Sequence, residues 1–258
     1  MRKIWLIART VLIEAVRRKE IYAIVLLTVG LIGVVGSIRF FNIEGLGKFY
    51  REIALKVMSL ATALTVVVLA ARQLPREFNN RTILPLLAKP VSRPIFLIGK
   101  FLGVMLAGGF CYGLFTVVFI AGNLYLKSPV NWKIFAQAAY LQCLALSVVA
   151  SLSFLLSMIL NLDAAITLSS LVYVLGQIFT STLSYIYDYV SEATKAVLLV
   201  MNFAVPQLTL FDLSGKVVHG ETWKPIGFWA MRDLSLYALG YVTLFFGLSY
   251  LIFRKKTI

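Results

Sequence analysis

The residues that could do chemistry in this chain are concentrated between positions 72 and 100. This interval holds six basic side chains, one acid and four of the seven prolines, and hydrophobic runs flank it on both sides. Glu77 and Arg81 stand four residues apart, a spacing at which two charges on a helix either pair or are offered to a partner. Pro90 and Pro94 then end any helix and favour an extended connection. The interval therefore has the chemistry of a docking segment.

The composition places this interval in a membrane protein. Of the 258 residues, 60% are hydrophobic and 14% are charged, with a mean hydropathy of +0.88. Soluble domains are about 45–50% apolar and about 25% charged, so a soluble fold would expose large apolar patches. The apolar runs are continuous, unlike the alternating segments of a transmembrane barrel. The sequence predicts an all-α polytopic membrane protein.

The chain lacks the residue patterns of an enzyme or of a self-powered transporter. It has no G-x-x-x-x-G-K-[ST] loop, no H-E-x-x-H motif and no nucleophile elbow. Its two cysteines lie in apolar runs and its one histidine lies in a loop, so we expect no metal or cofactor on this chain. Acids are nearly absent from the apolar runs, although ion-coupled transporters need them at membrane depth. We expect a non-enzymatic protein whose energy comes from a partner.

A charged amphipathic segment precedes six apolar runs that are long enough to cross a bilayer. Residues 1–20 repeat apolar side chains at three- and four-residue spacing among six basic residues. This pattern predicts a helix lying on an anionic cytoplasmic leaflet, with a simple charged flank of the first span as the alternative. The predicted transmembrane domain covers residues 21–258, with spans at about 21–38, 53–71, 95–122, 134–160, 164–185 and 234–253.

The distribution of lysine and arginine predicts the orientation. Fifteen of these residues fall in segments 1–20, 72–100 and 254–256, and ten fall on the other side of the predicted spans. Because positive residues favour the cytoplasmic side, we expect both termini and the loop 72–94 in the cytoplasm, and the long segment 186–232 outside. Basic residues at span ends, without a basic aromatic domain, argue against nucleic-acid binding. The expected location is the bacterial cytoplasmic (inner) membrane.

Small residues recur at four-residue spacing in the third predicted span. Such residues let the backbones of two helices approach closely. The partner helix could belong to the same chain or to a second copy, and packing within the chain is the favoured interpretation. The candidate packing or dimer residues are Gly99, Gly103, Ala107, Gly109 and Gly113.

The order of residues in the interval 72–100 resembles a known family. It contains a glutamate, an arginine–threonine pair, a leucine, a K-P-V-S-R run and a glycine–lysine pair, at Glu77, Arg81-Thr82, Leu86, Lys89–Arg93 and Gly99-Lys100. This series resembles the coupling segment of type-2 ABC transporter permeases. It is most similar to the permease group associated with multicopper enzyme maturation, including the nitrous oxide reductase maturation permease. Many members carry glycine where this chain has Arg81.

The resemblance implies a homodimer bound to two copies of a separate cytoplasmic ATPase, which would hold the ATP and Mg²⁺. It also implies a short coupling helix within residues 76–87, lying in a groove of the ATPase, and membrane lipids as the surrounding partner. Closure of the ATPase dimer would then push on the spans. The residues expected to contact the ATPase are Arg76, Glu77, Asn80, Arg81, Thr82, Leu86 and Arg93.

Three functions remain open at this point. The first is an ABC permease subunit that exports a substrate. The second is a mechanotransmitter that passes ATPase-driven motion to an extracytoplasmic partner through residues 186–232 without transport, as in metalloenzyme maturation. The third is a membrane scaffold or enzyme without an ATPase.

Overall fold

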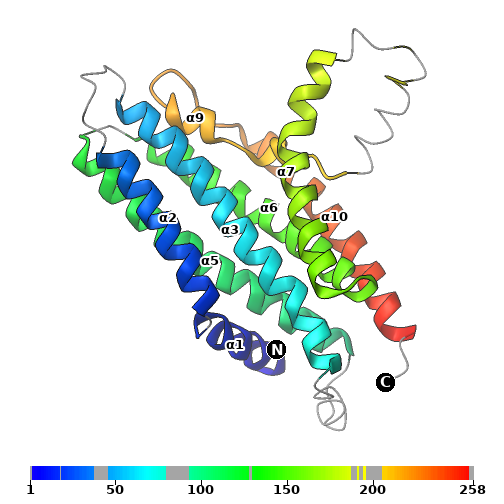
Figure 1. Ribbon diagram of the computed structural model, residues 1–258. Coiled ribbons are helices and arrows are strands. Elements are labelled where there is room, and N and C mark those ends of the chain that lie inside the picture. Colours follow the sequence, from blue (N-terminus) through cyan, green and yellow to red (C-terminus); the bar gives the residue numbers. More distant parts are fainter. Residues whose placement is uncertain are drawn as a thin grey trace.

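The computed structural model shows a bundle of long helices (Figure 1). It describes residues 2–17, 19–37, 46–79, 93–127, 130–186, 191, 194–195 and 205–255, and contains no strand in these ranges. The predicted all-helical class is therefore confirmed for the described part of the chain. The helices are α1 (Arg2–Val16), α2 (Lys19–Ser37), α3 (Leu46–Asn79), α5 (Arg93–Tyr125), α6 (Trp132–Ile159), α7 (Leu162–Ile186), η2 (Leu208–Phe211), α9 (Ser214–Val218) and α10 (Phe228–Lys255).

Length and composition identify membrane-crossing candidates among these helices. Within the described ranges, four helical stretches are long and apolar enough to cross a membrane, at Gly47–Pro75, Arg93–Tyr125, Trp132–Ile159 and Phe228–Arg254. α2 and α7 contain shorter apolar stretches, Val25–Val34 and Leu162–Gln177. A multi-pass membrane protein is thus supported, while the six spans and the cytoplasmic orientation of the termini stay predictions.

The two ends of the bundle differ in structure. α1 and the last turn of α10 lie at the end where α3 finishes and α5 begins (Figure 1). The short helix α9 lies near the opposite end, beside the first turns of α3 (Figure 1), and η2 packs on α6 and α7. We call the first the coupling end, because it carries the loop predicted at 72–94. We call the second the cap end, because residues 205–227 cover it.

α3 is longer than the span predicted at 53–71. It continues to Asn79, so residues 72–79 are helical although the sequence favours a loop from position 72. Pro75 lies inside this helix and removes one backbone hydrogen bond. Ala71 and Leu74 are fully buried in the core, and burial of such side chains outweighs the cost of one proline.

α1 packs directly on the first turns of α5. Ala8, Val11 and Ala15 are buried, whereas Trp5 and Leu6 on the same helix are more than half exposed. One apolar face of α1 therefore lies on the protein and another remains open, as expected for a helix at a membrane surface.

Two glycines of α5 make this contact possible. A Cβ at Gly99 would lie 2.8 Å from Cβ of Ile7, and a Cβ at Gly103 would lie 2.5 Å from Cβ of Val11. Ala107 is also buried. By contrast, a Cβ at Gly109 or Gly113 would meet no atom within 4 Å. The predicted small-residue stripe thus divides into a part that faces α1 and a part that faces open space.

Residues 205–227 form a folded cap on the cap end of the bundle. The side chains of Leu208, Phe211 and Val217 are buried among the long helices. The side-chain amide of Gln137 in α6 both donates to the carbonyl of Ile226 and accepts from its N–H, each at 2.9 Å. The cap is therefore part of the protein core rather than a free loop.

An ion pair joins this cap to α3. Lys56 donates to the carboxylate of Asp212, which also accepts from the backbone N–H of Ser214 at 2.9 Å. Burial raises the pKa of Asp212, but the hydrogen bonds from Lys56 and Ser214, together with the charge of Lys56, outweigh burial and hold the pKa below its ordinary value. The ionised form of Asp212 is thus stabilised in the folded protein.

We expect Gly103→Ala to destabilise the protein through the α1–α5 contact. The new methyl group would overlap Val11, and such overpacking typically costs about 1–3 kcal/mol. Gly113→Ala in the same helix is the matched control, since its Cβ meets open space and alanine favours helix. Thermal unfolding in detergent, followed by circular dichroism, measures both. Equal melting temperatures for the two variants would contradict the close contact.

We expect Asp212→Asn to reduce the acid sensitivity of the fold. Because the folded-state pKa of Asp212 is depressed, its contribution to the free energy of unfolding is present above about pH 4 and is lost as pH falls below that value. Lys56 is about half exposed, so the contribution is at most about 1 kcal/mol. Melting temperatures at pH 7 and pH 3.5 should differ less in Asp212→Asn than in the wild type. Asp233→Asn, which alters an exposed pair with Arg232, should keep the wild-type difference.

Candidate functional site

The candidate site is the coupling end of the bundle, where the loop that carries the predicted docking residues joins α3 to α5. Arg76 and Glu77 lie in the last turns of α3, and Arg93 is the first residue of α5. Four further predicted contact residues, Asn80, Arg81, Thr82 and Leu86, lie outside the described residues. The structure therefore shows how both flanks of the loop are held.

A buried lysine ties the two flanks together. Nζ of Lys100 in α5 donates to Oε1 of Gln73 in α3 at 3.1 Å, and the two residues are only 6% and 5% exposed. The ammonium group also lies 5.7 Å from the centre of the Phe96 ring. A buried charge without a hydrogen-bond partner is very costly, so this contact fixes α3 against α5. Gln73 lies one helical turn before Glu77, and the fixed point is therefore close to the docking residues.

A second contact ties the start of α5 to the end of α10. Nη1 of Arg93 donates to the backbone carbonyls of Phe253 at 3.1 Å and of Arg254 at 3.2 Å. The last carbonyls of a helix have no partner within the helix and carry its negative dipole end. The guanidinium group of Arg93 donates hydrogen bonds to these carbonyls and places a positive charge at the negative end of the dipole.

Aromatic packing reinforces this second contact. The guanidinium of Arg93 lies 5.6 Å from the centre of the Phe253 ring. Phe96, one turn further along α5, stacks on the same ring with 6.4 Å between centroids. Phe253 is fully buried. Arg93, expected from the sequence to contact an ATPase, is thus engaged with α10 in this structure.

The first three turns of α5 are the common element of the site. Arg93 and Phe96 contact α10, Lys100 contacts α3, and Gly99 and Gly103 contact α1. These contacts point in different directions around one helix. A displacement of the start of α5 would therefore act on three other helices.

Two residues of this site, Gln73 and Lys100, are absent from the contact residues predicted from the sequence, although Lys100 ends the series that resembles the permease family. Gln73 lies just after one apolar run and Lys100 lies near the start of the next, so the two polar side chains flank the same loop, which is a usable signal for pairing. The contact to Phe253 has no such signal, because it uses a backbone carbonyl that any residue would supply.

The described residues offer no arrangement for metal chemistry. Within these ranges, no group of three or more His, Cys, Asp or Glu side chains could hold a metal ion. The polar groups at the coupling end are instead arranged to hold helices together. The described polar contacts at this end therefore join α3, α5 and α10 to one another.

Comparison with known proteins identifies the family of this chain. A family model described as ABC-2 family transporter protein matches residues 7–258, which includes α1 from Ile7 onward, both flanks of the loop and the cap. A comparison with curated proteins finds no match. Because the family model covers nearly the whole chain, this protein belongs to the ABC-2 transporter family and is a multi-pass membrane subunit of an ABC transporter, a family that works with a partner ATPase.

Proposed function

We propose that this chain is the permease that couples ATP hydrolysis on a separate cytoplasmic ATPase to export of a substrate across the bacterial inner membrane. The observation that carries this proposal is the double attachment of the loop, through Lys100 to α3 and through Arg93 to α10. The proposed assembly is a homodimer with two ATPase copies. ATP and Mg²⁺ bind to the ATPase, and a coupling helix within residues 76–87 docks in its groove.

The coupling follows from the rigidity of these attachments. A push on residues 80–92 acts on the end of α3 and the start of α5 together, because Gln73 and Lys100 join them. Arg93 extends the same displacement to the end of α10. α5 has 33 residues and extends about 50 Å, more than the hydrocarbon thickness of about 30 Å. A tilt at the coupling end is therefore delivered across the bilayer.

A mechanotransmitter without transport is the second candidate, and the cap favours it. The cap is attached to α3 through Lys56 and Asp212, and to α10 through the bond from the N–H of Gln207 to the hydroxyl of Tyr237 at 3.0 Å. Motion of these helices would reach the segment 186–232 that an extracytoplasmic partner would contact. This role is the one expected of the maturation-permease group that the sequence resembles. A scaffold or enzyme without an ATPase has no observation in its favour.

We expect charge reversal at the docking residues to abolish stimulation of the partner ATPase. Glu77→Lys or Arg81→Glu would place like charges across the interface, and disruption of a desolvated charge pair costs about 2–5 kcal/mol. Membrane insertion should be unchanged. The measurement is ATP hydrolysis by the reconstituted complex, with Lys224→Glu, an exposed position in the cap, as the control.

The double variant Glu77→Lys/Arg81→Glu separates two explanations. If the two residues pair only with each other, reversal of both restores the pair and ATPase stimulation returns to the wild-type level. If each contacts the ATPase, the double variant stays inactive. Wild-type stimulation in both single variants would refute the docking assignment.

We expect Arg93→Ala to separate the ends of α5 and α10 while ATP hydrolysis continues. The substitution removes both hydrogen bonds to the α10 carbonyls, each worth about 1.5–3 kcal/mol when charge-assisted. Spin labels at the exposed positions Ile98 and Leu251 report the distance between the two helices. In the wild type, the distance distribution should have a single peak that ATP does not change. In Arg93→Ala, the distribution should be broad.

Arg93→Lys is the graded control for this measurement. Lysine keeps the charge but lacks the planar fork of arginine, so we expect an intermediate distance distribution. Identical distributions in the wild type and Arg93→Ala would show that the contact does not hold the two helices together.

A further inference from the structure

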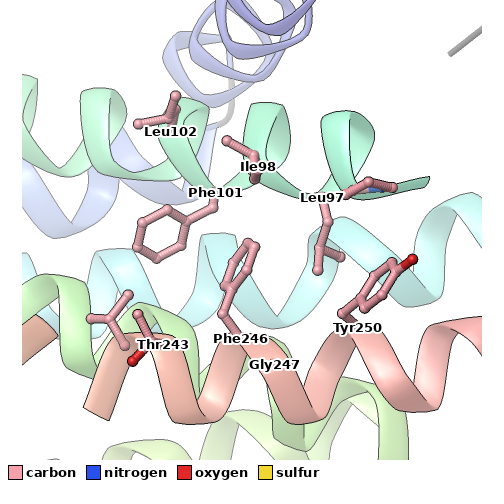
Figure 2. A pocket seen from close by; sticks show the side chains of 10 residues that line it. Leu97, Ile98, Phe101, Leu102, Thr243, Phe246, Gly247 and Tyr250 are labelled. Carbon is pink, nitrogen blue, oxygen red and sulfur yellow. The ribbon is translucent and has the colours of Figure 1, made fainter. Parts of the chain in front are cut away.

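A groove of about 440 Å³ runs between α5 and α10, near the coupling end (Figure 2). Its lining comes from the two helices alone and includes Leu97, Phe101, Leu102, Phe246, Gly247 and Tyr250. Figure 2 shows Phe101 and Phe246 extending toward each other between the two ribbons. The two helices are held together at Arg93 and Phe96 and leave this space beyond that contact.

The floor of the groove is a packed aromatic group. The rings of Phe101 and Phe246 meet edge to face with 5.1 Å between centroids. Phe154 of α6 supports both rings, at 6.2 Å and 6.3 Å. Ile98 and Leu102 on the rim are 39% and 42% exposed. The groove is therefore a formed depression that opens toward the surroundings of the bundle.

The groove offers almost only hydrocarbon contacts. The hydroxyl of Thr243 donates to the carbonyl of Gly240 at 2.9 Å and so is already satisfied. The lining from Pro94 to Leu102 spans nine residues, a rise of about 12 Å along the helix. One leaflet of the hydrocarbon core is about 15 Å thick. The groove thus matches the depth of a single leaflet.

Basic residues stand at the mouth of the groove. Pro94 and Tyr250 line its end at the coupling side, and Arg93 immediately precedes Pro94. The two carbonyl bonds of Arg93 use only the Nη1 donors, and a guanidinium has five N–H donors. Arg254 is exposed one turn after Tyr250, and the sequence continues with Lys255 and Lys256. An apolar groove therefore ends at a positively charged rim.

We propose that this groove binds one acyl chain of an anionic phospholipid, with the phosphate group at Arg93 and Arg254. The acyl chain lies on Phe101 and Phe246, and the headgroup lies at the membrane surface on the coupling side. Guanidinium groups recognise phosphate oxygens through paired N–H donors. The proposal rests on the membrane location shown by the family and not on export or coupling.

A second copy of the chain fits this surface less well. A two-fold contact through the groove would bring the same basic rim of both copies into one interface, where like charges repel. An anionic lipid instead neutralises the rim. Charge complementarity thus favours the lipid.

Gly247 provides a test that leaves the core intact. It lines the groove, and a Cβ there would meet no atom within 4 Å. Gly247→Phe should fill the groove without disturbing the helix packing. Gly240→Phe is the matched control, because Gly240 is exposed on the same helix, has the same open space and does not line the groove.

The experiment measures retained lipid by native mass spectrometry of the full-length protein. The probes are phosphatidylglycerol and phosphatidylcholine with identical acyl chains. We expect the wild type and Gly240→Phe to retain phosphatidylglycerol preferentially. Gly247→Phe should lose about tenfold in affinity for both lipids, because displacement of two methylene groups already has that effect.

Arg254→Gln tests the headgroup contact separately. This variant should lose the preference for phosphatidylglycerol while it still retains phosphatidylcholine. Wild-type retention by Gly247→Phe, or equal loss in Gly240→Phe, would refute the groove as the lipid site. A change of oligomeric state in Gly247→Phe with unchanged lipid retention would identify the groove as an interface between copies and would also refute the proposal.

Discussion

A positive charge buried in an apolar bundle requires a partner, and the coupling end of this protein depends on how Lys100 meets that requirement. Its bond to Gln73 joins α3 to α5 beside the point where the docking residues leave the bundle. The bond stabilises this end of the bundle because its loss would remove a hydrogen bond from a buried ammonium group and from a buried amide, which is costly. The bond therefore fixes the register of the two helices at this end.

The glycines of α5 add α1 to the same unit. Without side chains at Gly99 and Gly103, α1 lies directly on the α5 backbone, while Trp5 and Leu6 stay open toward the surroundings. If the open face binds the membrane surface, as the sequence predicts, α1 would anchor the first turns of α5 at that surface. The proposed coupling would then involve a tilt of α5 about its contact with α1 rather than a displacement along the helix axis.

Most of the architecture could be predicted from sequence patterns within single helices. The contacts between distant segments could not be predicted in this way. The apolar runs predict the helices, and the small-residue spacing predicts close packing at Gly99 and Gly103. The extension of α3 to Asn79 was not predicted, because Pro75 and the charges beside it are local signals for a loop whereas the burial of Leu74 depends on other helices. The ion pair between Lys56 and Asp212 joins residues 156 positions apart, and no spacing rule covers that distance.

The two ends of the molecule are joined by the same helix, and this bears on the choice between export and force transmission. α3 carries Lys56, which holds the cap, and Gln73, which holds the start of α5. These positions are 17 residues apart, about 26 Å along a helix, so one helix links the cap to the attachment at the coupling end. A tilt imposed at Gln73 must either carry the cap with it or break the pair with Asp212. That pair is partly exposed and worth about 1 kcal/mol at most. It is therefore a weaker attachment of α3 than the buried bond between Gln73 and Lys100. Breakage of this pair alone would still leave the cap attached through Gln137 and through its buried side chains, so the geometry favours a cap that moves together with the long helices.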